Sequence, residues 1–193
     1  MKKFLIYLGA FALLFLYFIL TIFILPSEFL MTDQLVPEPT FESVLSNSNI
    51  TLGDSFRLDI TSVNNGDYAD IHIVSVAFPD LIQTDNVVKI ATYDFTLSPS
   101  YIYVDEEIGS KYSGGVETIL AQYPSIEAMS RPLKPNVPTH FDLVITPQEL
   151  GLFNIYVKSI GIPHTSSTSH YPYSGTLDHQ NEYVSVYSVS VNP

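Results

Sequence analysis

The sequence lacks cysteine and tryptophan altogether among its 193 residues. Without a thiol it can form no disulfide, no cysteine-based zinc, iron–sulfur or blue-copper site, and no cysteine nucleophile. A folded domain must therefore be held together by its core. Basic residues are also scarce, since eight lysines and arginines stand against 20 aspartates and glutamates. This acidic balance repels nucleic acid and anionic lipid.

Charge is absent from an apolar run that begins at Phe4 and ends at Leu25, directly after Lys2 and Lys3. As a helix, this run would measure roughly 33 Å, which is enough to cross a hydrocarbon core of about 30 Å. A cleaved signal peptide usually has a shorter apolar core and a small-residue cleavage site. We therefore expect residues 1–25 to form an uncleaved transmembrane signal anchor, with residues 4–25 in the lipid bilayer. The lysines predict a cytoplasmic N-terminus and an extracytoplasmic remainder in a single-pass membrane protein.

The remainder of the chain divides by composition. Residues 26–49 are rich in proline, serine and asparagine and predict an irregular stalk, with at most one helical turn at 41–45. Residues 50–193 are long enough for one domain. The sequon Asn49-Ile50-Thr51 marks Asn49 as a candidate glycosylation site where the stalk meets the domain.

Apolar and polar residues alternate with a period of two through much of the domain. At Phe56, Leu58 and Ile60 the pattern indicates a strand with one buried face. Similar runs occur at 70–78, 87–97, 101–104, 141–145, 153–157 and 183–191. The sequence thus predicts an all-β fold, an antiparallel β-sandwich of about seven strands preceded by one N-terminal transmembrane helix.

One long segment, residues 105–138, departs from this alternation. It is rich in proline and glycine, and four apolar residues within it fall on one helical face, namely Val116, Ile119, Leu120 and Tyr123. We expect an insertion between strands that either binds a partner or simply crosses a sheet end.

Two segments resemble the CARDB-like and related immunoglobulin-like domains. Residues 52–70 place a glycine before an alternating strand and an Asn-Gly turn after it, and residues 141–155 place proline and glycine around a turn that an aromatic follows. The resemblance implies an immunoglobulin-like sandwich that serves as a noncatalytic binding or spacer module. Such modules are common on prokaryotic, and especially archaeal, cell-envelope proteins. Residues 105–138 and 162–180 depart from the family pattern.

A histidine-rich loop near the C-terminus carries a candidate metal site. Its candidate ligands for copper or zinc are His164, His170, His179 and Asp178. Their spacings match no standard site, so the loop would have to fold around the metal. The alternative is that these histidines are solvated. The acidic clusters at 67–70 and 105–107 have two alternative interpretations. They could bind calcium, or they could only keep strand edges soluble.

No catalytic motif accompanies these candidates, since G-x-S-x-G, H-E-x-x-H and phosphate-binding glycine loops are all missing. We therefore expect neither enzymatic activity nor a cofactor. The expected role is a structural or protein-binding component of the cell envelope, or an accessory subunit of a membrane complex, with a protein partner at the cell surface. The alternative role is an extracytoplasmic copper- or zinc-binding domain. Tyrosines combine contact area with a polar tip, and the candidate partner-binding residues are Tyr101, Tyr103, Tyr123, Tyr171 and Tyr173.

Overall fold

The computed structural model describes residues 2–21, 35–108, 119–132, 134–163, 169–172, 174–178 and 181–193. The chain forms two compact units, Met1–Gln34 and Leu35–Pro193. In the first unit, helix α1 covers Lys2–Ile19. None of the helical residues described here makes up a helix with the length and hydropathy of a membrane span. Residues 22–25 of the predicted anchor lie outside the described residues.

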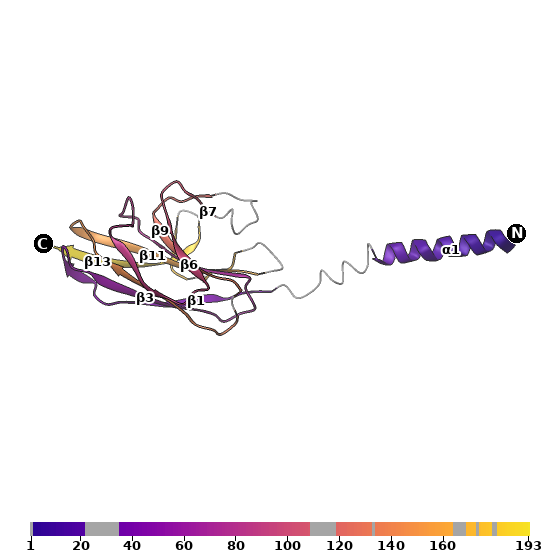
Figure 1. The fold of residues 1–193 in the computed structure, drawn as a ribbon, viewed down its shortest axis with the longest axis horizontal. Helices are drawn as coiled ribbons and strands as arrows, with labels where there is room; N and C mark the ends of the chain where they lie inside the picture. Colours follow the sequence, from indigo (N-terminus) through magenta and orange to yellow (C-terminus); the bar gives the residue numbers. More distant parts are fainter. Residues whose placement is uncertain are drawn as a thin grey trace. The chain divides into compact units, whose positions relative to one another are not determined.

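The second unit consists mainly of two β-sheets (Figure 1). The four-stranded sheet has the order β1-β3-β10-β5, and its strands are β1 (Pro39–Leu45), β3 (Phe56–Asn64), β10 (Thr139–Ile145) and β5 (Val88–Tyr93). The other sheet has the order β12-β13-β11-β4-β9-β6. Its strands are β12 (Thr176–Leu177), β13 (Tyr183–Asn192), β11 (Gly151–Ile162), β4 (Ile71–Ala77), β9 (Ser125–Ser130) and β6 (Leu97–Ile102).

Three short strands complete the unit. Strand β2 (Asn49–Thr51) pairs with β13 in the parallel direction, whereas the strand pairs within the two sheet paths are antiparallel. A separate small hairpin joins β7 (Glu107–Ile108) to β8 (Ile119–Leu120). The described residues thus hold more strands than the seven predicted, because several strands are too short to show an alternating pattern.

The core lies between the two sheets because alternate residues of each strand face inward. Phe56, Leu58 and Ile60 of β3 are all buried, as are Phe141 and its alternate neighbours on β10. The opposing sheet contributes Val74, Val76, Ile126, Ala128, Ile155, Val157 and Val189. The all-β fold is therefore confirmed, with an arrangement consistent with a sandwich.

The interior changes from apolar to polar along the strands. At one end, the ring of Phe153 packs against Phe56 and Phe78, with ring centroids 6.2 Å apart in each pair. The other end, called the base here, lies where residues 35–39 join the sandwich: Asn65 N donates to Glu38 O over 2.9 Å. Buried polar side chains gather toward the base, among them Ser62, Asn64, His72, Ser130, Thr139 and Ser159.

The predicted stalk is wrong in its second half. Pro39–Leu45 forms strand β1 and pairs with β3 along its whole length. Phe41 and Leu45 pack against the core, which explains why this segment joins the sheet. Pro39 does not prevent this, because it is the first residue of an edge strand, where no inward hydrogen bond from its nitrogen is required. Residues 26–34 lie outside the described residues.

The predicted insertion at 105–138 is also wrong in part. Ser125–Ser130 forms β9, which lies between β4 and β6 in the larger sheet. Its two inward apolar residues, Ile126 and Ala128, are too few to produce a clear alternation beside serine and glutamate. Ile119 and Leu120 belong to strand β8 rather than to a helix. Residues 109–118 and 133 lie outside the described residues.

Candidate functional site

The predicted metal ligands fall in different settings. His164 and His179 lie outside the described residues. His170 makes a backbone bridge with Gly161, with N–H to O distances of 2.8 Å in both directions. Asp178 Oδ2 lies 3.2 Å from Lys158 Nζ, and its side chain is only 5% exposed. Among the described residues there is no cluster of three potential metal ligands. To bind an ion through Oδ2, Asp178 would have to break its ion pair with Lys158.

Lys158 is the centre of a partly buried ion cluster. Its Nζ also lies 2.5 Å from Glu182 Oε2, and Asp178 Oδ1 accepts a hydrogen bond from the Glu182 backbone N–H at 3.0 Å. Burial alone lowers the pKa of Lys158, but the charges of Glu182 and Asp178 outweigh burial and raise that pKa above its ordinary value. The cluster therefore ties Asp178 and Glu182 to strand β11.

The described candidate tyrosines have separate local contacts. The Tyr103 hydroxyl donates to both carboxylate oxygens of Asp85 at 3.2 Å. The Tyr101 hydroxyl reaches Val88 O at 3.4 Å. The Tyr123 ring packs edge-on against Tyr156, and Tyr171 packs against Tyr183. Tyr173 lies outside the described residues. A shared tyrosine patch stays a prediction.

Asn49, the candidate glycosylation site, is an exposed residue at the start of β2. Its Oδ1 accepts a hydrogen bond from Asn192 Nδ2, which holds the side chain against the last residues of β13. Glycosylation of Asn49 stays a prediction.

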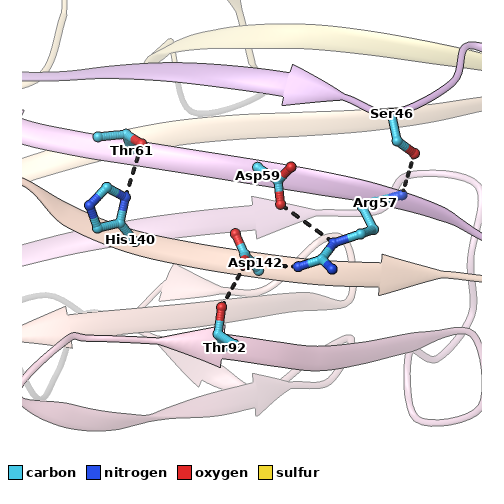
Figure 2. Close-up of polar contacts among 7 residues, drawn as sticks. All are labelled: Ser46, Arg57, Asp59, Thr61, Thr92, His140 and Asp142. Carbon is cyan, nitrogen blue, oxygen red and sulfur yellow. Dashed lines mark hydrogen bonds and ion pairs between the residues drawn. The ribbon is translucent and has the colours of Figure 1, made fainter.

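A polar cluster covers the outer face of the four-stranded sheet (Figure 2). Asp59 on β3 stands directly opposite Asp142 on β10. Arg57 Nη2 lies 3.0 Å from Asp142 Oδ2, and Arg57 Nε lies 3.7 Å from Asp59 Oδ1. Thr92 on β5 donates to Asp142 Oδ2 at 2.5 Å. The sequence shows these residues only as the polar partners of an alternating strand, so it gives no sign that they meet.

The two facing aspartates titrate differently. Partial burial, followed by the hydrogen bond and charge of Asp142, raises the pKa of Asp59. Burial also acts to raise the pKa of Asp142, but hydrogen bonds, led by the one from Thr92, and the charge of Arg57 outweigh it and lower that pKa. Arg57 offsets one of the two carboxylate charges, and its ion pair with Asp142 joins β3 to β10.

A second polar cluster is enclosed between the sheets near the base. His72 Nε2 lies 3.0 Å from Ser62 Oγ and 2.9 Å from Ser159 Oγ, and the two hydroxyl oxygens are 3.1 Å apart. All three residues are fully buried. Within the described residues His72 Nδ1 has no hydrogen-bond partner, so nothing there orients the ring as in a catalytic triad. Burial lowers the pKa of His72 from 6.5 to about 4, which keeps the ring neutral.

The end of the sandwich opposite the base carries an exposed groove lined by both apolar and polar residues, called the tip groove here. It is formed by the loop between β4 and β5, the loop between β10 and β11, and the start of β11. Ile82 is 90% exposed, Leu150 56% and Leu152 63%, and all three line the groove. The other lining residues are Asp80, Leu81, Gln83, Asn86, Val87, Pro147, Gln148, Glu149, Gly151 and Phe153.

Hydrogen bonds fix both loops that form the tip groove. Asp80 Oδ2 accepts from the backbone N–H of Asn154 at 2.6 Å and from its Nδ2 at 3.1 Å. Thr146 N donates to Val87 O at 2.8 Å and so joins one loop to the other. Gly151 adopts a φ of 125°, a conformation that favours glycine, where the second loop turns into β11. The exposed side chains of Ile82 and Leu150 therefore extend from loops that hydrogen bonds hold in place.

The tip groove could not be predicted from the sequence because most of its members lie in loops, outside any periodic pattern. Ile82 follows Pro79-Asp80-Leu81, and Leu150 follows Gln148-Glu149. The available signal was one or two aliphatic residues within an otherwise polar loop.

Comparison with known proteins gives a likeness of fold. No protein-family model and no curated protein matches the chain. Solved structures that it resembles include the CARDB domain of a Pyrococcus furiosus protein, described in complex with di-metal ions, at 14% identity and a TM-score of 0.41, covering 83% of this chain and 98% of that one. A cohesin module from a Clostridium perfringens family 33 glycoside hydrolase resembles it at 13% identity and a TM-score of 0.40, covering 82% and 98%. These values carry no inference about activity or ligands.

Proposed function

We propose that this protein is a noncatalytic, protein-binding module held at a cell membrane. Residues 4–25 lie in the bilayer, the N-terminus is cytoplasmic, and the β-sandwich is outside. The apolar run and the lysines before it support this placement. The similarity of residues 52–70 and 141–155 to CARDB-like domains supports a role in a prokaryotic, and most of all an archaeal, cell envelope. There the module acts as a structural component or as an accessory subunit of a membrane complex.

The observation that carries the binding role is the exposure of Ile82, Leu150 and Leu152 in one groove. Exposed apolar side chains cost free energy in water unless a partner covers them, and contiguous exposed apolar patches commonly mark interaction sites. The Ser62, His72 and Ser159 cluster is fully buried, so we assign it no substrate.

Site-specific photocrosslinking tests this role in the native setting. A photoreactive residue replaces Ile82 in the full chain, expressed in cells of the source organism, and the matched variant carries it at Val44, which is 62% exposed on β1. We expect irradiation to produce a protein adduct from position 82 and not from position 44. Equal adducts from both positions, or none from position 82, would contradict the proposal.

A further inference from the structure

The tip groove carries charge of one sign around its apolar side chains. Its lining residues include Asp80 and Glu149 and no lysine or arginine. Asp80 is engaged by Asn154, so the exposed Glu149 is the carboxylate best placed to meet a ligand. Beyond Lys2 and Lys3 only six basic residues remain against all 20 acidic ones, a difference of −14. The local charge and the overall field therefore both attract a cation.

This charge selects among possible occupants of the groove. A second copy of the chain would bring the same carboxylates face to face, which costs association free energy. An anionic lipid surface would be repelled by the acidic domain. A protein segment with basic residues meets the opposite charge, and an apolar side chain on that segment would cover Ile82, Leu150 and Leu152.

We propose that the tip groove binds a segment of another protein in which an apolar side chain is flanked by lysine or arginine. The inference rests on the proposed function and specifies the class of partner. The apolar side chain packs against Ile82 and Leu152, and the basic side chain pairs with Glu149. Because Asp80, Thr146 and Val87 already fix the loops by hydrogen bonds, the loops themselves lose little conformational entropy when the segment binds.

Fluorescence anisotropy with the full chain in a nonionic detergent tests the inference. The probe is a short labelled peptide in which leucines alternate with lysines. Two control peptides replace the lysines by glutamate or the leucines by serine. Ile82→Asn and Glu149→Gln alter the groove, while Val44→Asn and Glu42→Gln make the same changes at exposed positions of β1. Protein-free micelles of the same detergent measure any peptide bound by detergent alone.

We expect the lysine–leucine peptide to bind and both control peptides to bind more weakly. Ile82→Asn should weaken binding about tenfold, and Glu149→Gln should weaken it about threefold at low salt, with a smaller effect at high salt. The two β1 variants should bind as the unchanged chain does.

Four outcomes of the peptide measurement overturn the inference, and a fifth comes from self-association. The four are no binding by the lysine–leucine peptide, equal binding by the serine peptide, preference for the glutamate peptide, and equal binding by all the variants. Self-association of the full chain that Ile82→Asn abolishes would assign the groove to a second copy instead. Preference for the glutamate peptide would leave the proposed function intact, because the groove would still bind protein. The proposed protein-binding role is rejected separately, if position 82 gives no specific crosslink.

Discussion

Individual polar residues inside this protein hold strands together, and two of them show how burial controls ionisation. His72 is buried without a carboxylate partner among the described residues, so burial lowers its pKa to about 4. Lys158 is also largely buried, but two carboxylates raise its pKa. The same desolvation thus leaves one side chain neutral and the other charged, and each case makes a different prediction.

His72 should make the stability of the fold depend on pH. The unfolded chain binds a proton at His72 below about pH 6.5, whereas the folded chain does so only near pH 4. The stabilisation is therefore complete above pH 6.5 and is lost as the pH falls towards 4, by roughly 2 kcal/mol between pH 7 and pH 5. Urea unfolding at pH 7 and at pH 5 measures this loss of stability. His72→Gln should remove most of this dependence and His140→Gln, at an exposed position, should not. Equal pH dependence in both variants would contradict the assignment.

Lys158 should matter more to stability than an exposed ion pair. Lys158→Met leaves Asp178 and Glu182 without their cation and should lower the free energy of unfolding by about 3 kcal/mol. Arg57→Met is the matched control, because Arg57 is half exposed and should cost 1 kcal/mol or less. Urea unfolding at pH 7 compares the two variants. A Lys158→Met cost no greater than that of Arg57→Met would show that the buried cluster is unimportant.

Among the strands, β1 departs most from the prediction, because it belongs to the domain although its residues were expected in the stalk. Gly66 shows how closely the chain before β1 is packed: a Cβ added there would lie 2.3 Å from Val36 O and 2.6 Å from Glu38 N. Residues 36–38 are thus in contact with the turn after β3, which a loose stalk would not be.

Gly66→Ala tests this packing. The new methyl group must displace residues 36–38, so we expect a loss of roughly 2 kcal/mol in the free energy of unfolding. Gly53→Ala is the control, since an added Cβ there meets nothing and only the φ of 93° opposes it, at a cost of about 1 kcal/mol. Thermal and urea unfolding of both variants decide. If Gly66→Ala lowers the free energy of unfolding no more than Gly53→Ala does, the result would support a stalk that extends to residue 38.

The long alternating strands could be predicted from the sequence, and the shorter or irregular ones could not. β3, β10 and β11 each bury at least three alternate apolar residues, so the period is visible. β9 buries two apolar residues between polar ones, and β1 begins with a proline, which resembles a linker. The tip groove and the Arg57 cluster depend on which loops and strands become neighbours. Pairing of this kind is decided by the fold, and residue patterns along one strand do not contain it.

For the molecule as a whole, the two ends of the sandwich differ in structure, and we propose that they differ in role. The base receives residues 35–39 and encloses the polar cluster of His72, whereas the tip groove exposes Ile82, to which we propose a partner binds. We also propose that the sandwich lies outside the cytoplasm.

Cysteine labelling in intact cells tests that placement most directly, because the chain contains no cysteine of its own. Ala91 is exposed on β5 away from the tip groove, so Ala91→Cys provides a single reactive thiol, and a cysteine inserted before Lys2 provides the opposite probe. With a membrane-impermeant maleimide, the account predicts that position 91 is labelled in intact cells and that the N-terminal cysteine is labelled only after permeabilisation. Labelling of position 91 only after permeabilisation would contradict it.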